Sequence, residues 1–437
     1  MALERTRVAA RTAVRSAPRL HFLISVEQTY FRKGFGLRGE IQGALTDDYH
    51  SAVVDEVRAR GYSVTVGDLT VRLAQEFGFC YGVDRAVEYA YETRAKFPGK
   101  RIHLVGEIIH NPHVNAKLED MGIAILARSP SGDFDFSHVT ANDVVILPAF
   151  GVTRDDFERL RAMGAVLVDT TCGSVLNVWK RVESYARDGF TAVIHGKYQH
   201  EETKATASQV SQFPGGRYLV VRDMAEARLV CDFIERGSGA DELQRRFAAA
   251  SSSGFDPARD LERVGIANQT TMLSSESLAI AAEIRRAMTA RHGAAALGEH
   301  FRSFDTICSA TQDRQDAVLR LLQDSVEVVV VVGGYNSSNT NHLAALCAER
   351  VPTYHVQDAG CIVPESGTIR HKPVGTQQET EVAGWLAPGA HVVGVTAGAS
   401  TPNNKVGEAI SRIFATRGLE LAAALAPGAP VSGNRVS

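Results

Sequence analysis

Short runs of β-branched and other apolar residues recur along the chain, and each is followed by a polar or glycine-rich turn and a helix-like pattern. Clear examples are "DVVILPAFGVTRDDFERLRAMG", "TAVIHGKYQHEETKATASQ" and "VEVVVVVGGYNSSNTNHLAALCAERV". Strand-length apolar runs that alternate with helical periodicity are typical of βα units and parallel sheets. The pattern therefore predicts an α/β fold from about residue 65 onward.

Three segments depart from this alternation. Residues 1–64 read as a basic arm and an extension, and residues 421–437 have the composition of a disordered tail. Residues 234–260 are richer in glycine, serine and charge than their flanks, and we interpret them as a surface insertion within a domain.

Composition narrows the class of protein. With 437 residues, 44% hydrophobic and 22% charged, the chain is long enough for two or three domains with buried cores. A formal net charge of −3 argues against nucleic acid or an anionic membrane as a partner, because such partners select basic surfaces. No run of 18 apolar residues occurs, so we expect no membrane span.

The N-terminus has the charge bias of an organelle transit peptide but lacks the apolar core of a secretory signal. The other interpretation is a short disordered basic arm on a bacterial protein. We expect a bacterial cytoplasmic location, or a plastid location if the segment is a transit peptide. The bias rests on a single acid, Glu4, against Arg5, Arg7, Arg11, Arg15 and Arg19.

The cysteines are too few and too scattered for the disulfide framework of a secreted protein, which favours a reducing compartment. No CxxC pair occurs, so a zinc ribbon or a thioredoxin-like site is not expected. Any metal site must be assembled from distant parts of the chain. The six positions are Cys80, Cys172, Cys231, Cys308, Cys347 and Cys361.

Three of these cysteines share one structural position. Cys80, Cys172 and Cys308 each come just before a segment with helical periodicity, in "GFCYGVDRAVEYA", "VDTTCGSVLNVW" and "TICSATQDRQDA". A helix N-terminus carries partial positive charge and free N–H groups, which favour the thiolate that binds metals. The spacings become similar once the insertion is subtracted, which suggests one cysteine in each of three domains. Cys231 and Cys347 instead fall on apolar helical faces, where buried, inert thiols are common.

Three converging thiolates without a fourth are compatible with two kinds of metal site. One is zinc with an open coordination position, and the other is an iron–sulfur cluster in which one iron lacks a protein ligand. Ligation by sulfur alone favours the cluster, because catalytic zinc usually carries histidine or carboxylate ligands. The alternative is that the three cysteines are unrelated core residues.

Two loops between a strand and a helix are candidates for anion binding. "GGYNSSNTNHL" places Ser337, Ser338 and Asn339 beside the free N–H groups of a helix start, and "VTAGASTPNN" does the same for Ser400. A serine at such a position can also serve only as a helix cap. The presence of two such loops favours one shared anion.

Histidines and a pair of acids complete the candidate chemistry. His110 follows a strand in "GEIIHNPHVN", and His200 precedes Glu201 and Glu202 at the start of a helix. A glutamate in a first turn can merely compensate the helix dipole, but an acid beside a histidine also suits proton delivery. "ANQTTML" adds hydroxyl donors at 270 and 271. No GxGxxG or P-loop motif occurs, which weakens nicotinamide and nucleotide hypotheses.

Eight segments, in order, closely resemble the 4-hydroxy-3-methylbut-2-enyl diphosphate reductase (IspH/LytB) family. The resemblance runs from about "YFRKGFG" to "SRIF", and the "RKGFG", "LPAFG" and "HEET" stretches are similar to the longer plant and cyanobacterial form. The segments are "GFCYGVDRAV", "EIIHNPHVN", "VDTTCGSVLNVW", "HGKYQHEETKATAS", "ANQTTML", "TICSATQDRQDA", "GGYNSSNTNHL" and "GVTAGASTPNN".

The resemblance implies three similar α/β domains with small, mostly parallel sheets, in a pseudo-threefold, clover-like arrangement around a 4Fe-4S cluster. One cysteine from each domain would hold the cluster, matching Cys80, Cys172 and Cys308, and one iron would stay open for the substrate hydroxyl. The boundaries that we expect are 81–172 for the first domain, 173–304 for the second with its insertion, and 65–80 plus 305–420 for the third.

The activity implied is the reductive dehydroxylation of (E)-4-hydroxy-3-methylbut-2-enyl diphosphate to isopentenyl and dimethylallyl diphosphate. This is the last step of the methylerythritol phosphate route to isoprenoids. Electrons would come from ferredoxin or flavodoxin, since the chain shows no flavin or nicotinamide site of its own.

Site residues carry over by matching motif positions. Glu202 matches the family's proton-delivering glutamate, with Glu201 as the rival assignment, and Thr270 matches the threonine near the substrate hydroxyl. We expect Thr271 to contact the substrate as well. The residues that match the diphosphate-binding positions are His110, His200, Ser337, Ser338, Asn339 and Ser400.

This chain departs from the family pattern at two positions. Phe150 stands where the short bacterial form has a third histidine, so one diphosphate donor is missing. Gly173 follows the second cysteine, where a proline is usual, which leaves the ligand in place and loosens the turn. A non-catalytic iron–sulfur sensor on the same fold and a zinc hydrolase of phosphorylated substrates are the alternative functions.

Overall fold

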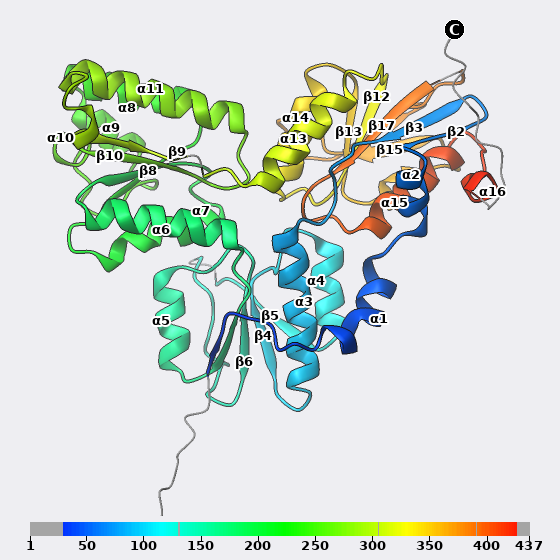
Figure 1. The fold of residues 1–437 in the computed structure, drawn as a ribbon, viewed down its shortest axis with the longest axis horizontal. Helices are drawn as coiled ribbons and strands as arrows, with labels where there is room; N and C mark the ends of the chain where they lie inside the picture. The colour runs from blue at the N-terminus through cyan, green and yellow to red at the C-terminus, as the bar shows by residue number, and fades with distance from the viewer. Residues whose placement is uncertain (1–28, 130–131, 305, 390, 426–437) are drawn as a thin grey trace, which may run out of the picture.

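The computed structural model describes residues 29–425, apart from 130–131, 305 and 390. The arginine-rich arm and the end of the predicted tail, 426–437, lie outside the described residues. The described chain forms three lobes around a common centre (Figure 1), and each lobe is built on a mostly parallel sheet flanked by helices. The predicted α/β class with several small, mostly parallel sheets is therefore confirmed.

The first lobe, at the bottom of Figure 1, contains a parallel sheet in the order β1-β7-β6-β4-β5. Its three middle strands are buried at every position, as expected for strands covered on both faces. The strands are β1 (Tyr30–Phe31), β4 (Ile102–Val105), β5 (Ile123–Leu126), β6 (Val144–Leu147) and β7 (Val166–Asp169). The helices are α3 (Tyr81–Lys96), α4 (Pro112–Asp120) and α5 (Arg154–Ala162).

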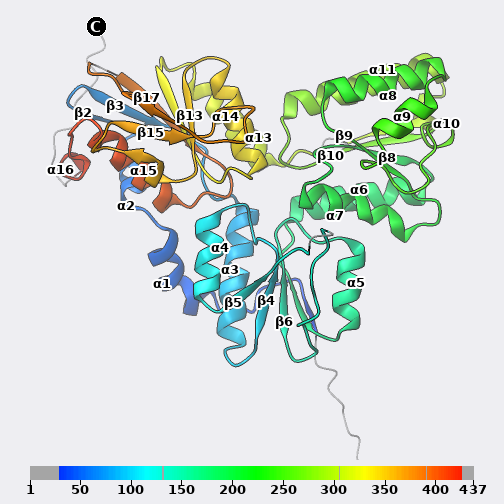
Figure 2. The ribbon, with the colours of Figure 1, turned by 180° about the vertical axis from the view of Figure 1, so that it is seen from behind.

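The second lobe contains a parallel sheet in the order β11-β10-β8-β9, and its helices α8 and α11 pack side by side (Figure 2). The strands are β8 (Thr191–His195), β9 (Tyr218–Val221), β10 (Val264–Asn268) and β11 (Phe301–Ser303). The helices are α6 (Gly173–Arg187), α7 (Glu201–Ser208), the 3-10 helix η1 (Gln209–Gln212), α8 (Met224–Arg236), α9 (Ala240–Arg246), α10 (Pro257–Asp260), α11 (Ser274–His292) and α12 (Leu297–His300).

Residues 234–260, expected as a surface insertion, contribute to the core of the second lobe. Leu243, Phe247 and Phe255 are buried in the same apolar cluster as strands β8 and β10. These apolar side chains lie between glycine, serine and charged residues, so average composition hid their packing role.

The third lobe contains a sheet in the order β13-β12-β17-β3-β2, parallel except for the β2–β3 pair. A separate antiparallel sheet has the order β14-β15-β16. The strands are β2 (Ser63–Val66), β3 (Leu69–Leu73), β12 (Val328–Val332), β13 (Thr353–Val356), β14 (Ile362–Val363), β15 (Thr368–His371), β16 (Thr380–Ala383) and β17 (His391–Ala397). The helices are α2 (Ala52–Ala59), α13 (Ser309–Leu321), α14 (Ser338–Ala348), the 3-10 helix η2 (Ala359–Cys361), α15 (Asn403–Ala415) and α16 (Leu421–Leu425).

The chain enters the third lobe twice. Strand β3 pairs with β17, more than three hundred residues later, so the segment before Cys80 belongs to the same sheet as the segment after Cys308.

The ordered part of the third lobe ends later in the chain than expected. Residues 421–425, assigned from composition to a disordered tail, form α16, and Leu421 is buried in the lobe's apolar cluster.

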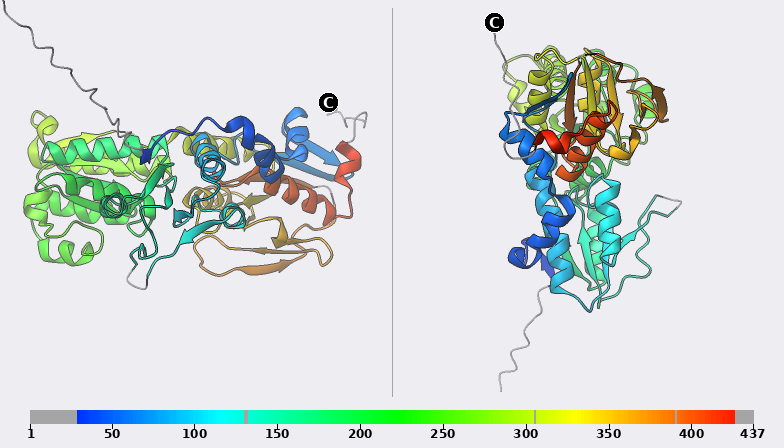
Figure 3. Two further views of the ribbon diagram at one scale, coloured as in Figure 1. Left: turned by 90° about the horizontal axis from the view of Figure 1, so that it is seen from below. Right: turned by 90° about the vertical axis from the view of Figure 1, so that its right-hand side faces the viewer.

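The N-terminal extension, dark blue in Figure 3, runs along one face of the molecule. Glu92 of α3 fixes it to the first lobe. This carboxylate is 1% exposed and accepts the backbone N–H groups of Phe35 and Leu37, at 2.5 and 2.7 Å. Gly34 permits the approach, because a Cβ there would lie 2.4 Å from Glu92 Oε2. Helix α1 (Arg38–Tyr49) begins directly after this anchor.

Among the described residues, no helix is both long and apolar enough to cross a membrane.

We predict that Glu92→Ala lowers the free energy of unfolding by about 3 kcal/mol, because it leaves two half-buried N–H groups without their charged acceptor. Urea denaturation measures this change, and limited proteolysis before residue 50 should become faster. The matched control is Glu88→Ala, which removes a carboxylate 3.7 Å from the exposed Arg38 and should change stability by less than about 1 kcal/mol. Equal stability of the two variants would contradict this account of the extension.

Candidate active site

The three cysteines singled out by the sequence occupy equivalent positions. Cys80, Cys172 and Cys308 are the residues immediately before α3, α6 and α13, which confirms the prediction that each cysteine precedes a helix. All three have extended backbone, so the helix begins only after the cysteine. Their side chains line one cavity at the meeting point of the lobes. Residues far apart in sequence are thus brought together as a set of three thiols.

Burial raises the pKa of the Cys80 and Cys308 thiols, and hydrogen bonds from helix N–H groups lower it. Burial raises the pKa of Cys80, while backbone hydrogen bonds from Val83 and Gly82 lower it. Burial likewise raises the pKa of Cys308 to about 11, although Thr311 donates its N–H to the sulfur at 3.3 Å. A metal bound in the cavity would instead lower the pKa of its ligand thiols, because metal ligation deprotonates them.

Two residues that support the cysteines were missed in the sequence. Arg314 is 4% exposed, and its guanidinium donates to the carbonyl oxygens of Gly78 and Phe79, at 2.7 and 3.2 Å. It therefore holds the loop that leads into Cys80. Thr311 was detectable, since it lies three residues after Cys308 at a capping distance. Arg314 gave no such signal, because its targets are more than two hundred residues away.

Glu202, at the start of α7, is the buried acid of the cavity. It is 1% exposed, and the N–H of Thr270 donates to its Oε1 at 2.6 Å. Burial raises the pKa of Glu202 to about 7, while hydrogen bonds from Thr270 act in the opposite direction. Near neutral pH the carboxyl group can therefore both hold and release a proton.

The neighbouring acid faces a different environment. Glu201 is about one-third exposed, lies 3.6 Å from the guanidinium of Arg128 and lines an adjoining cavity that excludes the cysteines. Burial and position thus distinguish two acids that sequence alone left as rivals, and they favour Glu202 as the proton donor.

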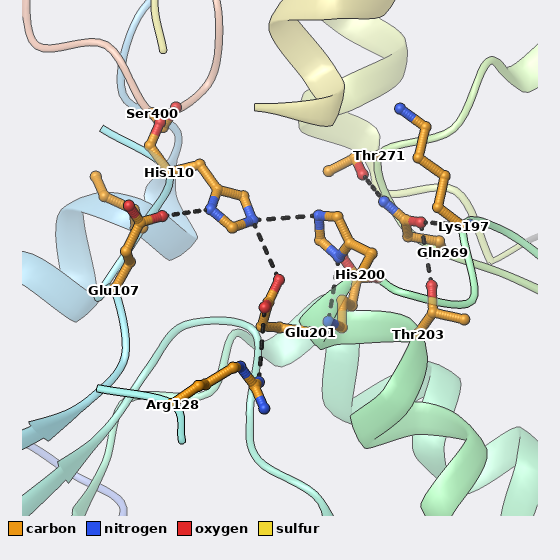
Figure 4. A network of polar contacts seen from close by, with 12 residues as sticks. Glu107, His110, Arg128, Lys197, His200, Glu201, Thr203, Gln269, Thr271 and Ser400 are labelled. Carbon is orange, nitrogen blue, oxygen red and sulfur yellow. Dashed lines mark hydrogen bonds and ion pairs between the residues drawn. The ribbon is translucent and has the colours of Figure 1, made fainter. Parts of the chain in front are cut away.

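The two predicted histidines face each other across the junction of the first and second lobes (Figure 4). Their Nε2 atoms lie 3.3 Å apart, and His110 Nδ1 lies 2.7 Å from Glu107 Oε2. Burial lowers the pKa of His200 to about 3, so this imidazole is neutral at physiological pH. Phe150 stacks on His110 with ring centroids 4.2 Å apart, so the residue that replaces a histidine packs against the other two rings.

The third lobe contributes polar groups from two loops. Ser337 caps α14 by accepting the N–H of Thr340, as the structural interpretation of this serine predicted. Ser338 Oγ and Asn339 Nδ2 are buried and have no hydrogen-bond partner among the described residues. Such groups are costly to bury unpaired, so they mark a place for a polar ligand. Ser400 Oγ donates to the backbone oxygen of His110 at 3.1 Å.

Thr271 also lines this cavity, and the Nε2 of Gln269 donates a hydrogen bond to its Oγ1 at 2.8 Å. Every site residue chosen from the sequence therefore lines one cavity, while the rival Glu201 does not. The predicted residues that surround it are Cys80, His110, Cys172, His200, Glu202, Thr270, Thr271, Cys308, Ser337, Ser338, Asn339 and Ser400.

Several known proteins are similar to this chain in sequence, and a solved structure is similar in fold. A family described as "LytB protein" matches residues 71–414. The 4-hydroxy-3-methylbut-2-enyl diphosphate reductase of Gloeobacter violaceus is 48% identical over 396 residues, which cover 90% of this chain and 94% of that protein. The reductase of the same name from Thermosynechococcus vestitus is 47% identical over 391 residues, covering 89% of this chain and 95% of that protein.

A solved structure is similar in fold. It is the E-1-hydroxy-2-methyl-but-2-enyl-4-diphosphate reductase from Plasmodium falciparum, with a TM-score of 0.57, 20% identity and coverage of 79% of this chain and 87% of that one. With the extent of the family match and the identity to the two relatives, the motif resemblance is confirmed: this chain belongs to the LytB protein family.

Proposed function

We propose that the protein reductively removes the hydroxyl group of (E)-4-hydroxy-3-methylbut-2-enyl diphosphate, giving isopentenyl and dimethylallyl diphosphate. The observation that carries the proposal is one cavity at the junction of the three lobes, lined by three thiols, a buried acid and two buried polar groups that have no hydrogen-bond partner among the described residues. The relatives that bear the reductase's name match along about nine-tenths of the chain, which favours this activity over a non-catalytic sensor.

The residues present fit a 4Fe-4S cluster with three protein ligands. A Cβ on Gly82 would lie 2.5 Å from Cys172 Sγ and 3.9 Å from Cys80 Sγ, so the missing side chain at this position lets the two thiols approach the first turn of α3. Cys80, Cys172 and Cys308 would hold the cluster. When bound, it supplies electrons and, at the iron without a protein ligand, a Lewis acid.

The diphosphate end of the substrate suits the side of the cavity where His110 of the first lobe and His200 of the second lie near the polar loops of the third. His200 offers an N–H, and Ser338 and Asn339 offer buried donors that have no partner within the described part of the chain. A ligand held there would satisfy them and direct its carbon chain toward the cysteines. Burial of the surrounding side chains excludes bulk water from the reacting end.

Glu202 and Thr270 suit the hydroxyl end. The reaction consumes two electrons and two protons, breaks the allylic C–O bond and releases the oxygen as water. Glu202, with its pKa near 7, can give a proton to the departing hydroxyl group, while the Thr270 N–H keeps the carboxyl group in one position. The second proton ends on the allylic carbon skeleton.

We expect an external carrier, ferredoxin or flavodoxin, to supply the electrons one at a time. Tyr81, directly after Cys80, is 81% exposed, so the chain beside this cysteine reaches the molecular surface. A short path from the surface to the half-buried thiol of Cys80 suits electron entry from a docked protein.

We predict that Glu202→Gln reduces turnover by at least about a hundredfold, because the amide cannot donate the proton that a carboxyl group donates. Dithionite-driven product formation by the anaerobic enzyme measures this loss, with iron content unchanged. Glu201→Gln is the matched control and should retain turnover, since this acid faces Arg128. Loss of activity in the control alone would assign proton delivery to Glu201.

We also predict that kcat falls as pH rises above about 7, because only the protonated form of Glu202 can donate. The decrease should approach about tenfold per pH unit. Turnover at saturating substrate between about pH 6 and 9 measures the profile, with the reductant's own pH dependence recorded in parallel. A flat profile over this range would exclude Glu202 as the rate-determining proton source.

A third prediction concerns the space beside the cysteines. Gly82→Ala should displace Cys172 and lower iron content and the absorption near roughly 400 nm that thiolate-ligated clusters show. The matched control is Gly173→Ala, beside Cys172, where a Cβ meets nothing within 4 Å. Retention of the full absorption by Gly82→Ala would show that the close approach is not needed.

A further inference from the structure

A chain of polar contacts connects the first and second lobes at the diphosphate side of the cavity (Figure 4). It runs from the Glu107 carboxylate to His110 Nδ1 at 2.7 Å, and from His110 Nε2 to His200 Nε2 at 3.3 Å. It ends at His200 Nδ1, which accepts the backbone N–H of Glu202 at 3.1 Å. Glu107 was not singled out in the sequence.

The backbone N–H at one end fixes the direction of every bond in this chain. An amide N–H can only donate, so His200 Nδ1 carries no proton. Burial lowers the pKa of His200 to about 3, so its ring is neutral and its one proton must be on Nε2. That proton points at His110 Nε2, which therefore accepts. The proton of His110 is then on Nδ1 and is donated to Glu107.

These proton positions satisfy the two histidines while the site is empty, but not when it holds a diphosphate. His200 can turn its N–H toward a phosphate oxygen, whereas His110 presents a lone pair at Nε2. A lone pair repels an anionic oxygen, so His110 can help to bind the anion only after a proton is added at Nε2. The ring would then be an imidazolium, with N–H groups at both nitrogens.

The charges around His110 favour that added proton. Glu107 lies against Nδ1, and Glu201 lies 3.9 Å from Nε2, although Arg128 partly neutralises it. The ring of His200 is neutral, and Phe150 stacks on the face of His110. The remaining acid, Glu202, lines the same cavity, and a positive charge on His110 lowers the pKa of Glu202. Glu107 is the only one of these acids in hydrogen-bond contact with the ring among the described residues.

We propose that Glu107 is a positioning residue that couples diphosphate binding to the uptake of one proton by His110. This inference rests on the proposed function, because it takes the diphosphate as the ligand of His110 and His200. Glu107 is 35% exposed, so the acid beside the buried ring also reaches solvent. The resting tautomer and the charged, substrate-bound form both depend on the same carboxylate.

The direction of the pH effect follows from the proton taken up. Because binding takes up a proton, the affinity for the diphosphate decreases as pH rises, by up to about tenfold in Kd per pH unit. Without the negative charge of Glu107 the imidazolium loses its nearest counter-charge. Binding should then be weaker and less dependent on pH.

The test uses the anaerobic holoenzyme and isopentenyl diphosphate, the product, as the calorimetric probe. Titrations in two buffers of different ionisation enthalpy give the number of protons taken up per ligand bound, and we expect about one for the wild type near pH 8. Glu107→Gln keeps an acceptor for the Nδ1–H but removes the charge. It should weaken binding by about tenfold, reduce proton uptake and flatten the pH dependence of KM, with kcat little changed.

A second carboxylate–imidazole pair provides the matched control. Glu327 Oε2 lies 2.9 Å from His391 Nδ1 in the third lobe, and neither residue lines the cavity. Glu327→Gln makes the same exchange and should leave proton uptake and the KM profile as in the wild type.

The outcomes separate this proposal from the proposed function. Binding of the product by the wild type without net proton uptake would overturn the coupling, as would a Glu107→Gln variant with unchanged uptake and KM profile. A wild-type holoenzyme that neither binds the product nor reduces the allylic diphosphate would instead overturn the proposed function.

Discussion

The structure depends on three cysteines that line one cavity. Each of them lies where the chain passes from one lobe to another. Cys80 lies between β3 of the third lobe and α3 of the first, and Cys172 lies between β7 of the first lobe and α6 of the second. Cys308 lies between β11 of the second lobe and α13 of the third. From β3 onward, every passage of the described chain from one lobe to the next therefore goes through a cysteine at a helix start. A group that binds all three thiols joins the three lobes at their crossings, so cofactor binding and the arrangement of the lobes are coupled.

Because the three lobes meet at this cavity, each lobe supplies a different set of side chains to it. The second lobe supplies the buried acid Glu202 and the imidazole of His200, and the third lobe supplies Ser338 and Asn339. The first lobe supplies His110, held between a carboxylate and an aromatic ring. A diphosphate held by these groups would bridge the lobes opposite the cysteines. Substrate and cofactor would thus act on the same inter-lobe junction from two sides.

Local signals in the sequence predicted much of this site, because they depend on neighbouring residues. Helix periodicity placed Cys80, Cys172 and Cys308 at helix starts, and motif order identified the polar loops. Contacts between distant segments could not be predicted in this way. Glu92 gave no sign that it anchors the extension, and Arg314 showed no target along the chain, because its partner carbonyl groups lie more than two hundred residues away. The choice between Glu201 and Glu202 needed burial, which only the folded chain supplies.

The most direct test of the central claim is the content of iron and acid-labile sulfide in the anaerobically purified protein. Three thiols that hold a 4Fe-4S cluster predict about four iron atoms and four sulfide ions per chain. A colourless protein that contains zinc and no sulfide would contradict the claim, because its thiols would then hold a metal that cannot deliver electrons.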